Sequence, residues 1–262
     1  MNGKTKAAVL TGYGINADYE LEYALRASGA EARRLHIHEL MDSPKMLDDF
    51  NLLAFAGGFS FGDDLGSGKV VANKFRFRLK DQMMDFVKQG KLVIGICNGF
   101  QMIAKMGLLP YADFSQKVTL SFNDSGKFED RWVYLKMNQK SPCVFTQGIG
   151  GLMLPVRHGE GKFISDGATL KDLAAKNMVA MQYVNERDEF AGYPYNPNGS
   201  AMNIAGICNP EGNVFGLMPH PEAYNAMTNN PFWPGVRERI TDWKGSGMKI
   251  FENAVSHING KF

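Results

Sequence analysis

The sequence predicts an open, doubly wound α/β fold: a mostly parallel sheet flanked by helices, with some antiparallel strands in the second half. Three observations predict it. Apolar, β-branched runs alternate with helix-like segments through the first hundred residues. After Pro110, strand-like runs follow one another with few helices between them. The 262 residues, 44% of them hydrophobic, are enough to bury one substantial core.

The first half predicts four strands and three helices in alternation. Its strands are short and apolar, as expected for a sheet covered on both faces, and its helices repeat apolar residues every three or four positions. We expect strands over 6–10, 32–38, 52–56 and 91–96, and helices over 18–28, 69–88 and 100–106. Parallel strands joined by helices place binding sites at the carboxyl ends of the strands.

The second half predicts mainly strands and loops, with one short helix and one at the end. A turn sequence at 209–213 separates the last two strands and is typical of a hairpin. We expect strands over 117–122, 131–137, 152–156, 204–208 and 214–218, helices over 170–176 and 247–258, and a loop over 185–200. Because we find no repeat or linker, we predict one domain over 1–262 with a helical tail from about 223.

Composition excludes several classes of protein. A net charge of +2 gives no large field for nucleic acid or an anionic membrane surface. The three cysteines argue against a disulfide framework, because they are few and odd in number, and they indicate a reducing compartment. We see no signal segment, membrane-spanning run or metal-ligand spacing of His and Cys. We therefore expect a cytoplasmic protein without a metal site, a membrane or a nucleic-acid partner.

The most informative segment joins a β-branched strand to a helix at Cys97. A side chain on such a sharp bend needs small residues two positions away on either side, and Gly95 and Gly99 occupy those positions. The unpaired amides and positive dipole end of the new helix favour a negatively charged sulfur. We predict that Cys97 is a nucleophile. The alternative, an inert buried cysteine, suits Cys143 and Cys208 better.

His220 and Glu222 alternate with two prolines in Pro219-His220-Pro221-Glu222. Proline fixes its own φ and biases the preceding residue towards extended geometry, in which residues two apart project to the same side. A carboxylate beside an imidazole fixes its tautomer and stabilises its protonated form, as a base serving a thiol requires. We predict this role for the pair. The alternative is a surface histidine near a glutamate.

A glycine-rich segment after the third strand predicts an oxyanion hole. The backbone N–H of Gly58, together with that of Asn98, could hold a developing negative charge, and removing one such donor typically costs about 10²- to 10³-fold in turnover. Gln101 lies one helical turn after the nucleophile and could share its face. The alternatives are a flexible loop and a solvated helix residue.

Two nucleotide-binding patterns are present but weak. Residues 66–70 partly match a phosphate-binding loop, but Asp63 stands where its first glycine belongs and Val70 replaces the magnesium-binding Ser or Thr. Residues 12–17 partly match a dinucleotide-binding fingerprint, which gives no role to the cysteine, histidine and glutamate above.

Two motifs resemble those of class I, or triad, glutamine amidotransferases: Gly95-x-Cys97-x-Gly99-x-Gln101 and Pro219-His220-Pro221-Glu222. Longer strings resemble the glutaminase subunits of phosphoribosylformylglycinamidine synthase within that group, and they lie at 57–64, 97–99, 125–132, 158–161 and 196–200. The resemblance runs from the first strand to about Glu222. It departs at Ala56, where the family usually has proline, and this loosens the loop while leaving its backbone donors in place.

The resemblance implies hydrolysis of glutamine to glutamate and ammonia through a thioester on the cysteine. The histidine would take the thiol proton and later protonate the leaving ammonia. The implied site comprises catalytic Cys97, His220 and Glu222, oxyanion donors Gly58 and Asn98, and substrate-binding Gln101, Asn123 and Arg131, the last two lining the site or contacting a partner. His158 receives no role.

The resemblance also implies a synthetase partner, with or without a small bridging subunit. In purine biosynthesis that partner would use ATP and Mg²⁺ to convert formylglycinamide ribonucleotide to formylglycinamidine ribonucleotide, while this chain holds no cofactor. The length agrees, since one domain without a nucleotide-binding motif leaves no room for a synthetase. The nearest alternative is another triad amidotransferase or a γ-glutamyl hydrolase with a different acceptor. A thiol peptidase or stress-response protein on a related fold would need the cysteine at the bend but not the linked histidine and glutamate. A non-catalytic binding or regulatory subunit would not need the intact set of three groups.

Overall fold

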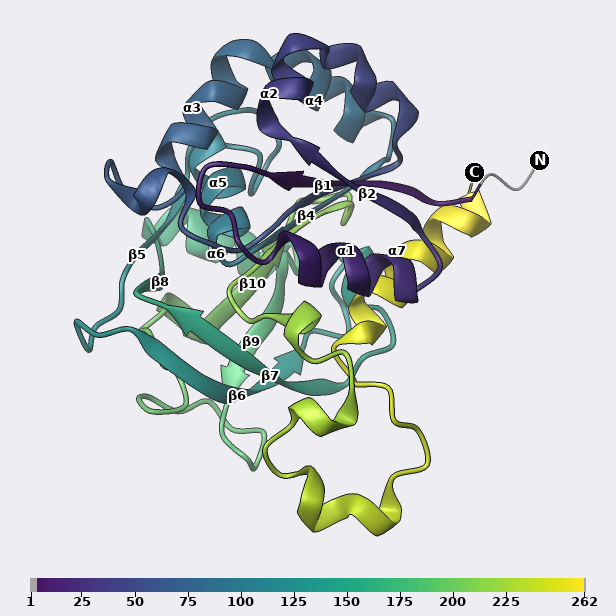
Figure 1. Cartoon of the computed structure of the whole chain (residues 1–262). Helices are drawn as coiled ribbons and strands as arrows, with labels where there is room; N and C mark the ends of the chain where they lie inside the picture. Colours follow the sequence, from purple (N-terminus) through teal and green to yellow (C-terminus); the bar gives the residue numbers. More distant parts are fainter. Residues whose placement is uncertain (1–3, 262) are drawn as a thin grey trace.

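The computed structural model describes residues 4–261, so residues 1–3 and 262 of the predicted domain lie outside the described part. A nine-stranded sheet forms its centre (Figure 1), in the order β2-β1-β3-β4-β11-β10-β9-β6-β7. The strands are β1 (Lys6–Thr11), β2 (Glu31–His36), β3 (Leu52–Phe55), β4 (Leu92–Ile96), β5 (Val118–Phe122), β6 (Glu129–Met137), β7 (Gly151–His158), β8 (Glu160–Ser165), β9 (Val179–Val184), β10 (Ile204–Cys208) and β11 (Val214–Leu217). The helices are α1 (Asp18–Ala27), α2 (Ile37–Asp42), α3 (Lys69–Arg78), α4 (Lys80–Lys88), α5 (Asn98–Met106), α6 (Gly167–Ala175) and α7 (Met248–Lys261).

The two halves of this sheet pair differently. Strands β2, β1, β3, β4 and β11 run parallel to their neighbours, whereas β11-β10, β10-β9, β9-β6 and β6-β7 are antiparallel pairs. Strands β5 and β8 form a separate antiparallel pair. The predicted α/β class, with antiparallel strands in the second half, is confirmed. The carboxyl ends of β1, β3, β4 and β11 therefore meet at one edge.

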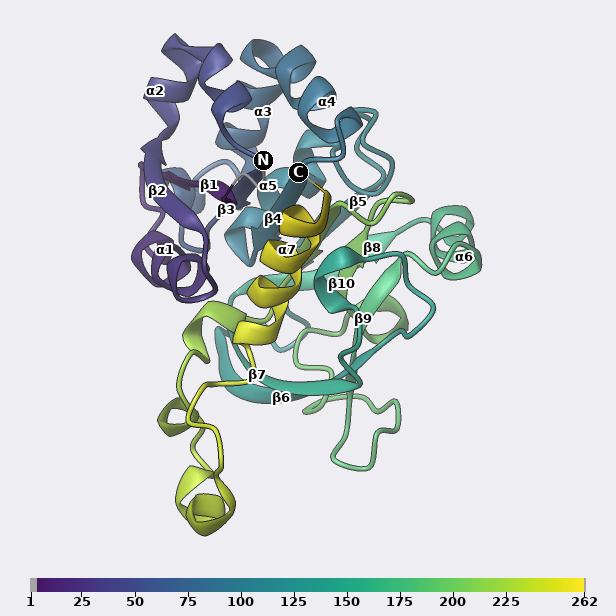
Figure 2. The same cartoon turned by 90° about the vertical axis from the view of Figure 1, so that its right-hand side faces the viewer.

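Helices cover both faces of the parallel half. Figures 1 and 2 show α1 and α7 side by side on one face, with α3 and α5 on the opposite face. The start of β1 and the end of α7 also meet, because Thr5 Oγ1 donates to Asn259 Oδ1 at 3.0 Å. The last helix is thus part of the folded body.

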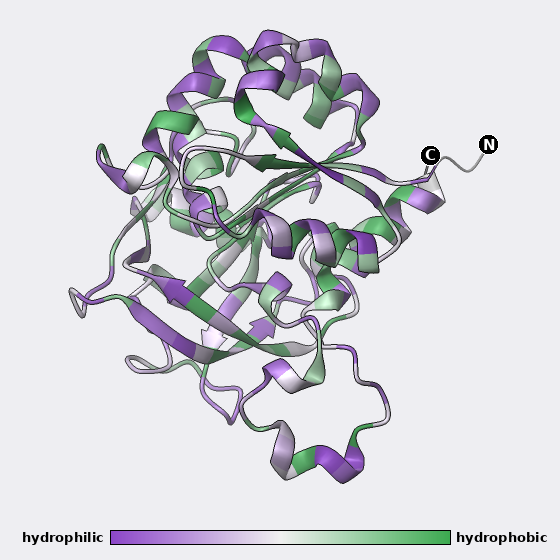
Figure 3. Cartoon of the chain, viewed as in Figure 1, coloured by the Kyte–Doolittle hydropathy of each residue, from purple (hydrophilic) through white to green (hydrophobic). Residues whose placement is uncertain are grey.

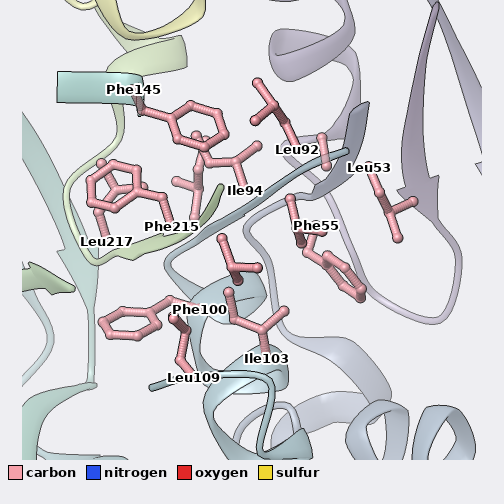
Figure 4. Close-up of a cluster of buried hydrophobic side chains, with 14 of the residues drawn as sticks. Leu53, Phe55, Leu92, Ile94, Phe100, Ile103, Leu109, Phe145, Phe215 and Leu217 are labelled. Carbon is pink, nitrogen blue, oxygen red and sulfur yellow. The ribbon is translucent and has the colours of Figure 1, made fainter. Parts of the chain in front are cut away.

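The largest apolar side chains gather on both faces of β3, β4 and β11 (Figure 4). Phe100 and Ile103 of α5 pack below β4 in that view, and Phe145 packs above it. All three are fully buried, and burying one such side chain stabilises a fold by about 1.5–3 kcal/mol. Figure 3 shows the same pattern, with hydrophobic residues concentrated along the central strands. Cys97, the candidate nucleophile, therefore directly follows a strand that is packed on both faces.

Two predicted elements of the first half are corrected. The single helix over 69–88 is two helices, α3 and α4, which meet at Leu79 with φ −133° and ψ 12°. The apolar spacing stays in phase across the break, since Phe75, Leu79 and Met83 are all buried. The strand over 32–38 ends at His36, whose side chain accepts the N–H of His38 and starts α2.

In the second half, β8 and β9 form where the sequence predicted no strand. Both are short, and periodicity separates such runs poorly from other structure. The predicted hairpin is confirmed, because β10 and β11 are antiparallel neighbours around the turn at 209–213.

The tail after Glu222 has two parts. Residues 225–247 project from the body with short 3₁₀ turns, as Figures 1 and 2 show, and Ala226 pairs with Lys244 at their base. Helix α7 then returns to the sheet. None of the helices within residues 4–261 is long and apolar enough to cross a membrane.

Candidate active site

Cys97 lies on a strained bend between β4 and α5. Its φ of 53° and ψ of −109° are unfavourable for a residue with a side chain, and such strain is typical of functional sites. The backbone is crowded on both sides. A Cβ on Gly95 would lie 2.7 Å from the carbonyl oxygen of Gly99, and one on Gly99 would overlap that of Phe55. The predicted bend, with its two required glycines, is therefore present.

His220 and Glu222 form a buried pair next to this bend. Nδ1 of His220 lies 2.5 Å from Oε1 of Glu222, and the two residues are 4% and 0% exposed. The expected position at the end of a strand is wrong in detail, because β11 ends at Leu217, Glu222 lies in a 3₁₀ turn over Pro221–Ala223 and His220 directly precedes that turn. The N–H of His220 donates to Pro155 O at 2.8 Å and fixes the turn against β7.

The His220 ring lies close to the Cys97 side chain. A Cβ on Gly57 would be 2.9 Å from Cε1 of His220 and 3.6 Å from Cβ of Cys97. Burial by itself lowers the pKa of His220. The negative charges of Glu222 and Cys97 raise it by more than burial lowers it, and the resulting pKa is about 10. Nε2 of His220 is buried and has no hydrogen-bond partner in the described part of the chain other than the Cys97 side chain, so it is placed to exchange a proton with sulfur or substrate.

In its protonated form, Cys97 donates its S–H to the backbone oxygen of Arg157 at 3.6 Å. This contact places the end of β7 beside the nucleophile. With its pKa raised to about 10, His220 is charged at neutral pH, and an imidazolium is the counter-ion that a nucleophilic sulfur requires. The arrangement can support attack by sulfur on an acyl carbon.

Gly58 brings a free backbone N–H to the same cavity. Its φ of +146° is accessible mainly to glycine, and a Cβ there would lie 2.7 Å from the oxygen of Gly14. Neighbouring backbone groups are paired, since Asn16 donates to Gly57 O and Phe59 donates to Gly14 O, whereas the N–H of Gly58 has no acceptor within residues 4–261. A donor left free in this way is available to an oxyanion.

Asn98 begins α5, where backbone N–H groups have no partner within the helix. Its side chain is fully buried and bonds to Gln101, whose Oε1 accepts from Asn98 Nδ2 at 2.8 Å. The amide nitrogen of Gln101 donates to Glu160 O at 2.5 Å. Gln101 lies beside the site but does not line the cavity, and both ends of its amide are bound to protein.

Asn123 lies away from the cavity. Its side chain donates to the backbone oxygens of Lys127 and His158, and its Oδ1 accepts from Gly161 N and from Nδ1 of His158. These four bonds occupy the amide, so the predicted substrate contact is corrected to a structural one. Asn123 joins the loop at 123–128 to the β7-β8 turn.

Arg131 is also outside the cavity. Its guanidinium pairs with Glu129, donates to the Tyr193 hydroxyl at 3.0 Å and lies 5.0 Å from the centre of that ring. The structure therefore does not bring it to the substrate. Its partly exposed position leaves open the contact with a partner that the resemblance implied.

Gly58, Cys97 and His220 line one cavity of about 320 Å³. The sequence missed most of its rim, which comes from α1, the segment after Gly58 and the loop before β6. The lining residues are Asn16, Ala17, Glu20, Gly58, Phe59, Cys97, Phe128, Arg157 and His220. The start of α1 follows β1 at the site edge of the sheet, and that position was the available signal for Glu20.

Neither nucleotide-binding pattern forms a nucleotide site. A Cβ on Gly14 would contact the backbone of Phe59, so protein already fills the turn at 12–17. Residues 66–70 follow a turn rather than a strand. Within the described range, no three His, Cys, Asp or Glu side chains are close enough to hold a metal ion.

Known proteins are similar to this chain over most of its length. A sequence model of the CobB/CobQ-like glutamine amidotransferase domain matches residues 4–258. The chain is 45% identical over 255 residues to phosphoribosylformylglycinamidine synthase subunit PurQ of Dehalococcoides mccartyi, covering 96% of this chain and 97% of that protein. Against PurQ of Methanococcus maripaludis strain S2, identity is 39% with 97% of each covered. A chain of the solved PurLQS structure from Thermotoga maritima matches with a TM-score of 0.69 and 32% identity, covering 97% and 99%.

Proposed function

The chain belongs to the CobB/CobQ-like glutamine amidotransferases, and within them to the PurQ subunits, and from this membership we propose that Cys97, His220 and Glu222 carry out its glutamine hydrolysis. It is the glutaminase subunit of a phosphoribosylformylglycinamidine synthase and acts in purine biosynthesis. The observation that supports these residues most strongly is the buried His220–Glu222 pair beside the strained cysteine.

In the first half of the reaction, the sulfur of Cys97 attacks the side-chain carbonyl carbon of glutamine. A sulfur–carbon bond forms, and the carbonyl electron pair moves to oxygen. The N–H groups of Gly58 and Asn98 stabilise that oxygen. The carbon–nitrogen bond then breaks, His220 gives its proton to the departing nitrogen, and ammonia leaves a γ-glutamyl thioester.

In the second half, water replaces ammonia. His220, now neutral, takes a proton from the water as it attacks the thioester carbon, and sulfur leaves with the bonding electron pair. Glutamate is released and the charged pair is restored. Glu222 keeps the His220 ring in one tautomer, with Nδ1–H on the carboxylate and Nε2 towards the reaction.

Ammonia produced here needs a receiver. The chain works with a synthetase subunit, in keeping with the PurLQS complex that contains its solved relative, and a small third subunit joins them. The partner converts formylglycinamide ribonucleotide to formylglycinamidine ribonucleotide. Direct transfer prevents the ammonia from being lost to water or protonated.

We further propose that this chain needs no cofactor of its own, while the synthetase uses ATP and Mg²⁺. The chemistry above uses only side chains and backbone groups of this chain. One sheet unites both halves, which supports the single-domain interpretation. A cytoplasmic location fits a purine-pathway enzyme with three unpaired cysteines.

The direct test replaces Cys97 with alanine in the assembled complex. Cys97→Ala should abolish glutamine-dependent synthesis, while added ammonium still supports the synthetase step. Synthesis is measured by product formation and hydrolysis by glutamate release. Continued glutamate release by the variant would remove Cys97 as nucleophile. Glutamate release from the wild type without glutamine-dependent synthesis would favour a γ-glutamyl hydrolase instead.

A further inference from the structure

The Asn98 side chain joins the two parts of the chain that carry the oxyanion donors. Its Oδ1 accepts the backbone N–H of Ser60 at 3.1 Å, and its Nδ2 donates to Gln101 at 2.8 Å. The same nitrogen lies 3.3 Å from an oxygen of Asp63. Asn98 is fully buried, so these bonds do not compete with water. One amide thus connects the start of α5 to the segment 58–63.

The backbone conformation of residues 58–63 is not one that these residues favour by themselves. Phe61, Gly62 and Asp63 have φ values of 54°, 65° and 56°, all in the left-handed region. For residues other than glycine, this region costs about 1–2 kcal/mol per residue. Strained backbone of this kind persists where surrounding contacts fix it.

The other contacts near Gly58 attach the segment elsewhere. Phe59 donates to Gly14 O at 2.9 Å and Phe61 donates to Tyr13 O at 2.6 Å, which joins it to the turn after β1. The side-chain bonds from α5 to residues 58–63 all come from Asn98.

An oxyanion hole depends on the distance between its two donors. Both should lie about 2.7–3.1 Å from one oxygen, and a small shift loses much of the stabilisation. Gly58 lies two residues before Ser60, which Asn98 holds, and the second donor is the backbone N–H of Asn98 itself. The side chain therefore fixes the first donor relative to the second.

We propose that the Asn98 side chain is a positioning residue, which holds the Gly58 segment against α5 so that both backbone donors face the same oxygen. This rests on the proposed function of the site. Substituting the side chain leaves both donors in the chain and changes their relative position. Attack on glutamine then slows, while the sulfur keeps its intrinsic reactivity.

Two reactions at Cys97 separate this role from a general structural one. Iodoacetamide alkylates the sulfur: a sulfur–carbon bond forms, iodide leaves with its electron pair, and no oxyanion develops. Glutamine requires the oxyanion. Loss of positioning therefore slows only the second reaction, whereas general disruption of the site slows both.

The experiment uses the full chain with its synthetase. Asn98→Ala should lower kcat for glutamate release about 10- to 100-fold, with KM and the alkylation rate of Cys97 each within about threefold of wild type. Asn98→Asp keeps an acceptor for the N–H of Ser60, so its kcat for glutamate release should lie between those of Asn98→Ala and wild type. The matched control is Asn253→Ala on α7, which removes an amide that donates to the backbone oxygens of Phe145 and Gln147, and it should change neither rate.

Amide hydrogen exchange provides a readout that needs no activity. In Asn98→Ala, and less in Asn98→Asp, Ser60 should exchange faster than in wild type, with no change in Asn253→Ala. Equal losses in hydrolysis and alkylation, unchanged hydrolysis, or unchanged exchange at Ser60 would each overturn the proposal. If wild type failed to hydrolyse glutamine while exchange still changed, the failure would lie with the proposed function and not with the contact.

Discussion

Two buried histidines lie near the nucleophile, and their surroundings give them opposite properties. His220 bonds a carboxylate, and its pKa is raised to about 10 despite burial. His158, at the end of β7, bonds the amide of Asn123. Burial and the charge of His220 lower its pKa to about 3. The two are 4% and 2% exposed, so exposure does not explain the difference.

The partner of each ring decides its charge. Oδ1 of Asn123 also accepts the N–H of Gly161, so it acts as an acceptor and Nδ1 of His158 carries the proton. His158 is therefore neutral, with a bare, buried Nε2 that has no partner in the described part of the chain. The histidine beside a carboxylate is therefore charged at neutral pH, and the histidine beside an amide is neutral.

The largest effect expected from this comparison is at His220. His220→Asn should lower kcat for glutamine hydrolysis by about 10³-fold or more, because it removes both proton transfers. Glutamate release by the full chain with its synthetase measures it. The equivalent change at His158 should cost far less, and equal losses at the two positions would contradict the division between them.

Glu222→Gln should come next. The substitution keeps an acceptor for Nδ1 of His220 but removes the charge that raises its pKa, so kcat should fall about 10²- to 10⁴-fold. In wild type, activity should fall as pH rises through about 10, where His220 loses its proton. In Glu222→Gln this fall should begin at lower pH. An alkaline limb at the same pH in both proteins would remove Glu222 as the source of the shift.

The smallest effect on turnover is expected at His158. His158→Gln removes one bond to Asn123, worth about 1 kcal/mol, so kcat should stay within about tenfold of wild type.

Its clearer signature is in acid stability. The unfolded chain protonates this histidine near its ordinary pKa of 6.5, the folded chain only near 3, so its stabilising contribution is lost as pH falls between those values.

Denaturant unfolding at pH 7 and pH 4.5 measures this loss. Relative to His158→Gln, the free energy of unfolding of wild type should fall by about 2–3 kcal/mol between pH 7 and pH 4.5. Gln139→Ala, which loses an amide bond to Ile149 O, should keep a constant difference from wild type. A constant difference for His158→Gln as well would mean that His158 is not held neutral.

Much of the fold could be predicted because its signals are local. The alternating runs of the first half gave the parallel strands, and the turn at 209–213 gave the hairpin of β10 and β11. The break at Leu79 could not be predicted, since the buried positions stay in phase across it. Strands β8 and β9 depend on long-range pairing that a short sequence window does not contain.

The candidate site divides in the same way. Cys97 was predictable because a strained bend needs Gly95 and Gly99 nearby, and His220 and Glu222 because prolines frame them. The rim could be predicted only in part: Glu20 follows β1 at the site edge of the sheet, whereas Phe128 reaches the cavity only through tertiary packing. Asn123 was misread for the same reason, because its four bonds go to residues brought together by folding.

We propose that sulfur, imidazole and carboxylate act as one unit on the glutamine side chain. Rapid acid quenching of wild type during glutamine turnover, followed by peptide mass spectrometry, tests it most directly. A γ-glutamyl group is expected on the peptide that contains Cys97. Hydroxylamine should remove it, and it should persist longer in Glu222→Gln. Turnover with the acyl group on another residue, or with no acyl group in either protein, would contradict it.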